Sequence, residues 1–447
     1  MTTPTADPIV ATLRGCAPYI HAHHGRVCVI GFGGEAAQRD DFDRLMYDVA
    51  LLHSLGVKLV LVPGARPQID ARLAARGITP QFVGGARVTD RAALECVKDA
   101  AGALRFEIEA RLSTSLASTP MGGAHIQAVG GNWITAKPVG VRAGVDHQFT
   151  GEVRRVDVAS IRQVLEQDRI ALVSPVGYSP TGEIFNIRAE DVATAVAAAI
   201  GAEKLIFVTP VRPDRWRSAQ GLGTAMGDAG QLPLTRAQDL LNESSTLNAL
   251  EQLYLRCALT ALRGGVARVH LLPQDRDGAL LRELYTRDGV GVMVHSDADY
   301  EATRDATIDD VGGIMALIKP LERDGTLVPR SREQLELDIQ HFRVMVRDGL
   351  VIACCALFAF ADSGMGELAC VAVHPDYQRA GRAAALLKRV ETEARALGLS
   401  QLFTLTTHTP HWFVEHGFTR ADIARLPMQR QQLYNYQRNS MVLVKPL

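Results

Sequence analysis

The 447-residue sequence lacks the features that direct a chain to a membrane, to nucleic acid or out of the cell. Its start, MTTPTADPIVATLRG, has neither the charged region nor the apolar core of a signal peptide. No apolar run reaches the ~18 residues that a membrane span needs. Lysine and arginine number 48 against 49 for aspartate and glutamate, so the net charge of −1 argues against a basic surface for nucleic acid or anionic lipid.

Cysteine is sparse, and its spacing matches no metal-binding or redox motif. The seven cysteines are Cys16, Cys28, Cys96, Cys257, Cys354, Cys355 and Cys370. An odd number of scattered thiols predicts reduced cysteines in a soluble cytoplasmic protein without a metal site. The sequence has no internal repeat and no low-complexity tract, and its hydrophobic content of 47% is enough for two or three domains, each with its own core.

Apolar runs and helical stretches alternate over the first two thirds of the chain. The run RVCVIGFGG (26–34) precedes a helical stretch (42–55), which precedes the run VKLVLVPGARPQID (57–70). Strand, helix and strand in this order predict parallel strands with right-handed crossovers. Because the pattern recurs as far as RVHLL (268–272), residues 1–296 are predicted to form a doubly wound α/β domain with a mainly parallel sheet.

A polar, acidic segment, HSDADYEATRDA (295–306), is predicted to be a linker. Apolar residues then repeat at helical spacing over 311–321. Strand-like runs follow at 350–360, 366–373 and 401–407. Residues 297–447 are therefore predicted to form a second, smaller α+β domain.

The stretch HPDYQRAGRAAALL (374–387) places glycine and alanine between a strand-like run and a helix. At such a junction the first helical N–H groups are unpaired and the helix dipole is positive, so an anion can bind there. Arg379 and Arg382 add positive charge. An ordinary strand-to-helix turn also explains the glycine spacing, so the surrounding sequence has to decide.

The wider pattern V-x-V-x-P-x-x-Q-x-x-G-x-A resembles the pyrophosphate-binding motif of the GNAT family of N-acetyltransferases. The resemblance covers about 300–447 and includes WFVEHGF (412–418), which is similar to a late signature of that family. It implies that acetyl-coenzyme A is a co-substrate and that no other cofactor is bound. The residues implied in its binding are Val371, Val373, Gln378, Arg379, Ala380, Gly381, Arg382 and Ala383.

The same resemblance implies a catalytic role for Glu367, at the start of the strand that faces coenzyme A. A carboxylate there can take the proton of the substrate amine directly or through water, although an edge-strand glutamate is also consistent with a solvated surface residue. Backbone N–H groups near Cys370 and Val371 are candidates for stabilising the thioester oxyanion.

Several groups in the sequence are candidates for protonating the leaving thiolate. The family often has a tyrosine where this chain has Phe413, which has no proton to give. Thr406, Cys370 and Tyr434 are the alternatives, together with solvent. Cys370 is also consistent with a small core residue.

Arginine is the natural partner of a carboxylate, and the resemblance implies that Arg330 and Arg438 bind an acidic substrate. Arg330 is expected between the first two helices of the second domain, and Arg438 on the last strand. Arg332, next to Arg330, is the alternative in the same segment.

Segments of the first domain resemble the amino-acid kinase family. They are VIGFGGEA (29–36), LVPGARPQID (61–70), GGARVTD (84–90), FNIRAEDVATAVA (185–197) and LLRELYTRDGVG (280–291). Such kinases hold ATP phosphates with lysines, but Gly31 stands in the place of the first one, and the later G-G-M-x-P-K stretch is missing. Because phosphoryl transfer depends on neutralising charge, the resemblance implies a scaffold without kinase activity.

The order of the two domains resembles the family of bacterial-type N-acetylglutamate synthases. The resemblance implies acetyl transfer from acetyl-coenzyme A to L-glutamate in the first step of arginine biosynthesis, inhibition by L-arginine, and a homo-oligomer, by family likeness a hexamer. For arginine, Glu283 is expected to bind the guanidinium, the amides of Gly289 and Gly291 the carboxylate, and Tyr19 to close the pocket or to pack between subunits. A bifunctional synthase–kinase and a non-catalytic arginine-sensing regulator are the alternatives.

Overall fold

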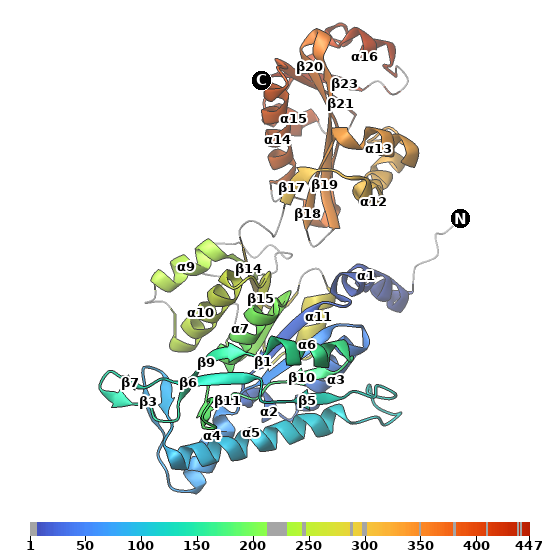
Figure 1. Cartoon of the computed structure of the whole chain (residues 1–447). Helices are drawn as coiled ribbons and strands as arrows, with labels where there is room; N and C mark the ends of the chain where they lie inside the picture. The colour runs from blue at the N-terminus through green and yellow to red at the C-terminus, as the bar shows by residue number, and fades with distance from the viewer. Residues whose placement is uncertain are drawn as a thin grey trace. The chain divides into compact units, whose positions relative to one another are not determined.

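The computed structural model describes residues 7–211, 230–243, 247–286, 289–296, 302–347, 350–378, 381–407, 410–435, 438 and 440–447 (Figure 1). The chain divides into two compact units, Met1–Asp297 and Ala298–Leu447.

An eight-stranded sheet forms the centre of the first unit. Its order is β14 (Gly230–Pro233), β16 (Val292–His295), β15 (Arg268–Pro273), β13 (Lys204–Thr209), β1 (Val27–Phe32), β2 (Lys58–Pro63), β10 (Ile170–Leu172) and β5 (Ala128–Gly130). All neighbours are parallel except β15 and β16. The predicted mainly parallel sheet is therefore confirmed, and its central strands are apolar because helices cover both of their faces.

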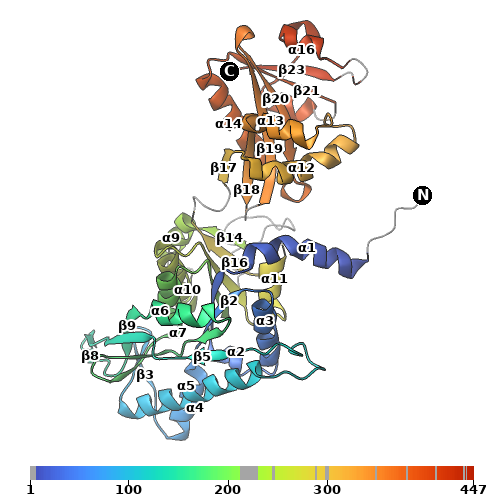
Figure 2. The ribbon, with the colours of Figure 1, turned by 45° about the vertical axis from the view of Figure 1, so that its right-hand side comes forward.

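Helices on the two faces of this sheet enclose two cores (Figures 1 and 2). One face carries α3 (Phe42–Ser54), α4 (Arg66–Ala75), α5 (Arg91–Leu112) and α11 (Ala279–Tyr285). The other face carries α6 (Val158–Glu166), α7 (Ala189–Ile200), α9 (Leu234–Asn242) and α10 (Ala249–Arg263). The N-terminal helix α1 (Pro8–His23) contacts α11, and α2 (Gly34–Ala37) follows β1.

Smaller sheets complete the first unit. A four-stranded sheet has the order β12 (Ile184–Asn186), β11 (Val176–Tyr178), β6 (Ile134–Pro138) and β9 (Gly151–Val156). Two hairpins pair β3 (Gln81–Val83) with β4 (Ala86–Val88) and β7 (Val141–Arg142) with β8 (Val145–Asp146).

A seven-stranded sheet forms the second unit. Its order is β17 (Ala302–Asp305), β18 (Phe342–Arg347), β19 (Leu350–Phe360), β20 (Met365–Val373), β21 (Gln401–Thr406), β23 (Met441–Pro446) and β22 (Thr419–Ala421). One face packs on α14 (Arg382–Ala396) and α15 (Pro410–Glu415), the other on α12 (Val311–Arg323) and α13 (Arg332–Asp338). A short helix, α16 (Met428–Gln432), lies between β22 and β23 in the sequence.

The structure corrects one sequence prediction at the start of this unit. Part of the predicted linker, Ala302–Asp305, is strand β17, which pairs antiparallel with β18. β17 is an edge strand whose residues are exposed or half-buried, so it needs no apolar periodicity. Arg304 within it is held by both carboxylate oxygens of Asp310.

Candidate active site

The sheet of the second unit opens after Glu367. β20 and β21 pair over only three positions, the last of which joins Glu367 to Phe403. β20 nevertheless continues to Val373, and β21 continues to Thr406 while still paired with β23. Among the described residues, the edge of β20 that faces β21 therefore has no strand partner over 368–373. Such an edge can bind an extended ligand through its N–H and C=O groups.

A β-bulge lies in the part of β20 that pairs with β19 but not with β21. The register with β19 shifts between Cys354 and Ala356, and Cys370 on β20 has a φ of 51°, which is uncommon for a residue with a side chain. Bulges re-aim backbone groups and often occur next to active sites. The predicted oxyanion-binding amides near Cys370 and Val371 therefore belong to a stretch of backbone that departs from regular strand geometry.

Cys370 itself is packed in the core of the unit. Its side chain belongs to the cluster beneath α12, and burial raises the pKa of its thiol to about 11. A general acid works best when its pKa lies near the working pH. The packing role of Cys370 is thus better supported than the role of proton donor.

Glu367 is buried and paired at the point where the strands separate. Its carboxylate receives two parallel hydrogen bonds from Arg430 on α16, Nε to Oε2 at 2.8 Å and Nη2 to Oε1 at 3.0 Å. The solvated-edge alternative does not fit this environment, because the Glu367 side chain is only 11% exposed. Arg430 lies 63 positions away in a polar segment, and no motif in the sequence points to it.

Arg438 lies just before β23 rather than on the last strand, which corrects the predicted position. Its Nη2 donates to the carbonyls of Gly325 and Thr326, whereas its Nε is buried without a hydrogen-bond partner among the described residues. Burial, together with the positive charge of Arg330, lowers the pKa of Arg438. A bound anion near the two guanidinium groups would offset the repulsion between them and favour the charged form of Arg438.

Arg330 lies between α12 and α13, as predicted. Its backbone N–H donates a hydrogen bond of 2.9 Å to the carboxylate of Glu322. This bond fixes the backbone at Arg330. Its charge acts on the thiol of Cys370 as well as on Arg438. Arg330 is therefore close enough for its charge to lower the pKa of both Cys370, in the bulge of β20, and Arg438.

The predicted phosphate loop connects β20 to α14. Gly381 precedes the helix with a φ of 73°. Among the described residues, no side chain caps the helix and no atom lies within 4 Å of a Cβ built on Gly381. Arg382 donates to the carbonyl of Tyr377 and stacks over its ring. A fifteen-residue helix with an open, uncapped N-terminus is a favourable site for an anion.

The other predicted coenzyme A residues surround this loop. Gln378 is exposed and donates to the carbonyl of Val373 at 3.3 Å. Val371, Val373 and Ala383 are half-buried. Arg379 and Ala380 lie outside the described residues.

The candidates for the proton donor differ in their surroundings. Tyr434 donates its hydroxyl proton to the carbonyl of Ser440 at 2.6 Å, so that proton is already engaged. Phe413 is a core residue packed against Phe418. Thr406 is buried at the end of β21, the strand that diverges from β20.

In the kinase-like unit, the packing explains why a glycine occupies position 31. Gly31 lies on β1, and a Cβ there would be 2.9 Å from the ring of Phe207 and 3.3 Å from the Cβ of Ala193. A lysine at this position would collide with the core between β1 and α7. The packing of the unit is thus consistent with a glycine at position 31 and opposes a lysine there.

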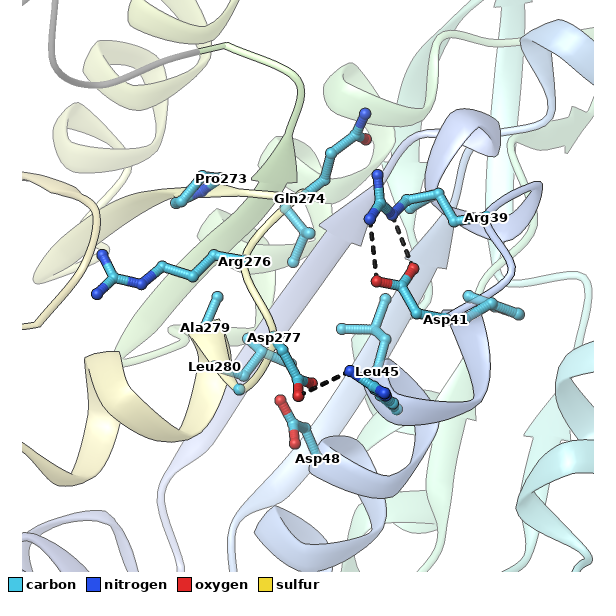
Figure 3. A pocket seen from close by; sticks show the side chains of 15 residues that line it. Arg39, Asp41, Leu45, Asp48, Pro273, Gln274, Arg276, Asp277, Ala279 and Leu280 are labelled. Atoms are coloured by element: carbon cyan, nitrogen blue, oxygen red, sulfur yellow. Dashed lines mark hydrogen bonds and ion pairs between the residues drawn. The ribbon is translucent and has the colours of Figure 1, made fainter.

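A pocket in the same unit lies between α3 and the segment from β15 to α11, and charged and apolar side chains both line it (Figure 3). Arg39 pairs with Asp41 through two hydrogen bonds, and Arg44 pairs with Asp277 at 3.0 Å. Burial, with a contribution from Asp277, raises the pKa of Asp48 to about 7. No predicted site residue lines this pocket.

The residues predicted to bind arginine are partly assembled at the end of α11. The carboxylate of Glu283 accepts hydrogen bonds from the amides of Val290 and Gly291, at 2.7 and 2.9 Å. Gly289 has a φ of 53°, and a Cβ there would lie 2.6 Å from Glu283. The amide of Gly291, which was expected to bind the ligand, is therefore bound by Glu283 in this structure.

His270 is a further member of this cluster that the sequence did not reveal. Its Nδ1 lies 2.7 Å from Glu283, and burial lowers the pKa of the imidazole. Burial acts to raise the pKa of Glu283, but the bonds from His270 and the two amides lower it below its ordinary value. Tyr19 is half-buried on α1, the helix that contacts α11.

The described residues contain neither a membrane-spanning helix nor a cluster of metal ligands. No helix among them is both long and apolar enough to cross a membrane. Nor do three or more His, Cys, Asp or Glu side chains in these parts of the chain form a group that could hold a metal ion.

Comparison with known proteins agrees with both resemblances. The profile of the amino acid kinase family matches residues 26–213, and that of the acetyltransferase (GNAT) domain matches residues 338–420. The amino-acid acetyltransferase of Ralstonia nicotianae is 50% identical over 446 residues, covering 100% of this chain and 97% of the relative. That of Azotobacter vinelandii is 50% identical over 438 residues, covering 97% and 98%.

Two solved structures of the N-acetylglutamate synthase from Neisseria gonorrhoeae are also similar. One, complexed with coenzyme A and L-arginine, is 37% identical with a TM-score of 0.86, over 99% of this chain and 100% of that chain. The other, complexed with coenzyme A and N-acetyl-glutamate, is 36% identical with a TM-score of 0.60 over the same shares.

Proposed function

The chain belongs to the amino-acid acetyltransferases, and we propose that it transfers the acetyl group of acetyl-coenzyme A to the amino group of L-glutamate. The observation that carries this choice of substrate is the pair Arg330 and Arg438, since L-glutamate has two carboxylates. The charge of Arg330 acts on Arg438 and on Cys370 of the opened strand β20. The similar N-acetylglutamate synthase, solved with N-acetyl-glutamate bound, supports the same substrate. The reaction is the first step of arginine biosynthesis.

Acetyl-coenzyme A is proposed to bind along β20. Its pyrophosphate meets the uncapped N-terminus of α14 at Gly381, and Arg382 supplies a positive charge there. Its extended pantetheine pairs with the free edge of β20 at 368–373. This arrangement places the thioester carbonyl near the bulge at Cys370, where backbone N–H groups can bind the developing oxyanion.

The chemical step begins when the substrate ammonium loses a proton to Glu367, directly or through water. The neutral nitrogen attacks the thioester carbon, forming the C–N bond and an oxyanion. The oxyanion collapses and breaks the C–S bond, so coenzyme A leaves as a thiolate. A proton from solvent, directly or relayed through the hydroxyl of Thr406, completes the thiol, and Glu367 then releases its proton to solvent. Positioned general-base help of the kind that Glu367 supplies contributes typically ~10²–10⁴-fold.

L-Arginine is proposed to inhibit the enzyme by binding at Glu283 in the kinase-like unit, with Tyr19 and the amides of Gly289 and Gly291 around it. The similar synthase solved with L-arginine supports this proposal. Because Glu283 already binds the amide of Gly291, a bound arginine has to replace that hydrogen bond with contacts of its own.

We further propose that the chain assembles as a homo-oligomer and that residues 1–296 and 297–447 are its functional domains. The hexameric size and the cytoplasmic location stay predictions from the sequence.

A thiol-release assay with acetyl-coenzyme A and L-glutamate tests the proposed function. We expect stoichiometric release of coenzyme A and formation of N-acetylglutamate, identified by mass spectrometry, and inhibition on adding L-arginine. ATP with N-acetylglutamate should give no phosphorylation, because Gly31 leaves no space for the missing lysine. Phosphorylation by the pure protein would favour the bifunctional alternative, and absence of acetylation would favour the regulator.

A further inference from the structure

The ion pair between Glu367 and Arg430 is a feature of the site that the reaction described above does not explain. Arg430 uses both Nε and Nη2 on the carboxylate, and its Nη1 donates to the carbonyl of Leu433 at 3.3 Å. The two side chains are 21% and 11% exposed, so the pair lies in a largely dehydrated environment. Bidentate pairs of this type fix the plane of the carboxylate as well as its charge.

We propose that Arg430 is a positioning residue for acetyl transfer, which orients the carboxylate of Glu367 toward the substrate amine. This inference rests on the proposed role of Glu367 as the base. An ionised carboxylate has about four lone-pair positions, and the two hydrogen bonds from Arg430 occupy one on each oxygen. The remaining positions are available to an ammonium group or a water molecule.

The location of the pair supports a role in the reaction rather than in folding alone. Glu367 is the last residue at which β20 and β21 pair, so its side chain lies where the sheet opens. The orientation of the carboxylate therefore decides which of its oxygen atoms can reach a substrate in the opened part. Arg430 comes from a helix of only five residues, α16, whose flanking side chains Met428 and Leu433 are 76% and 73% exposed. The helix buries little apolar surface around the arginine.

Gln431 provides a matched control on the same helix. Its side-chain amide donates to the carbonyls of Ala424 and Leu426, at 3.2 and 2.7 Å, and so anchors α16 without touching Glu367. A purely structural role of α16 predicts that Gln431→Ala and Arg430→Gln reduce activity to a similar extent. A positioning role predicts that only Arg430→Gln does so.

The experiment is a double-mutant cycle on the full chain. Steady-state kinetics with L-glutamate and acetyl-coenzyme A are measured for wild type, Arg430→Gln, Glu367→Gln and the double variant. We expect Arg430→Gln to lower kcat roughly 10²-fold, the size of effect that a small misplacement of a catalytic group produces. Glu367→Gln should lower it by ~10²–10⁴-fold. The double variant should be no worse than Glu367→Gln, because Arg430 acts through that carboxylate.

Two further variants keep the test valid if Arg430→Gln folds poorly. Arg430→Lys keeps the charge but loses the second hydrogen bond, and should recover part of the activity. Arg430→Ala should recover activity when guanidinium ion is added at millimolar concentration, whereas Gln431→Ala should not respond to it. Circular dichroism and thermal unfolding establish that each variant is folded.

Three results would overturn the inference. Activity of Arg430→Gln within threefold of wild type would make Arg430 dispensable. Losses that multiply in the double variant would mean that Arg430 acts independently of Glu367. If Glu367→Gln alone is as active as wild type, the base is elsewhere and so is any residue that positions it. In that case thiol release by the wild type still decides the proposed function separately.

Discussion

Arg438 offers the sharpest test of how the site recognises its substrate. Its Nε is buried and has no hydrogen-bond partner in the described parts of the chain, and its pKa is lowered by burial and by Arg330. A protein keeps two guanidinium groups in such an arrangement at a cost in stability, and a bound carboxylate removes that cost. Arg438→Gln should therefore weaken the binding of L-glutamate while leaving acetyl-coenzyme A binding unchanged.

The expected size follows from the bonds that are lost. A hydrogen bond to a charged group contributes ~1.5–3 kcal/mol. Since ~1.4 kcal/mol corresponds to tenfold in affinity, the KM for L-glutamate should rise about 10- to 150-fold. Stability should change by less than about 1 kcal/mol, because the loss of two hydrogen bonds to Gly325 and Thr326 is offset by relief of the repulsion from Arg330.

The assay is initial-rate kinetics with L-glutamate varied at saturating acetyl-coenzyme A, repeated with L-glutamine. If Arg438 binds the side-chain carboxylate, Arg438→Gln should lose discrimination between the two substrates, because glutamine carries an amide there. Arg332→Gln is the matched control, since Arg332 is 66% exposed and paired with Glu336. A KM for L-glutamate within threefold of wild type in Arg438→Gln would refute the reasoning.

Three other predictions concern other parts of the chain. Gly381→Glu should abolish coenzyme A binding measured by calorimetry. Gly381→Ala has the same strained φ but adds no charge, so it should weaken the binding only partly. Equal affinities of the two variants for coenzyme A would contradict an anion site. Because the folded pKa of Asp48 is raised from 3.8 to about 7, its ionisation destabilises the fold as pH rises between about 4 and 7. Asp48→Asn should remove this loss of stability. After allowing for solvent screening, the free energy of unfolding measured by chemical denaturation should rise by roughly 1–3 kcal/mol at pH 8 and change little at pH 4. Equal pH profiles of stability for the variant and the wild type would show that Asp48 is solvated. Glu283→Ala should raise the L-arginine concentration for half-inhibition by about 5–150-fold over that of the wild type, with each protein normalised to its own activity without arginine. An unchanged concentration would place the arginine site elsewhere.

The fold could be predicted where burial imposes a pattern on the sequence. β1, β2 and β13 are apolar along almost their whole length because helices cover both faces of the sheet, and such runs, alternating with helices, predict parallel pairing. β17 has only one neighbour and little buried surface, so its sequence, ATRD, carries no strand pattern. The antiparallel pairing of β15 with β16 depends on chain reversal through α11, which apolar periodicity does not encode.

The candidate site divides in the same way. Glu367, Gly381 and the segments containing Arg330 and Arg438 belong to motifs that a resemblance can recognise. Arg430 and His270 become important only through contacts across 63 and 13 positions, with Glu367 and Glu283 respectively. A single sequence does not show which polar side chain will meet which, because ion pairs of this kind are set by the tertiary fold.

In the kinase-like unit, the packing of the core disfavours a lysine at position 31. A glycine in place of the first lysine suggests, from the sequence alone, that one substitution would restore the phosphate-binding charge. The structure argues otherwise, because a Cβ at Gly31 would stand 2.9 Å from the ring of Phe207 and 3.3 Å from Ala193. Both neighbours belong to the buried core that joins β1 to α7, and enlarging a well-packed core typically costs ~1–3 kcal/mol. A lysine at position 31 would therefore require the ring of Phe207 to shift or to be replaced by a smaller side chain, so the core that stabilises this unit opposes the return of its first phosphate-binding lysine.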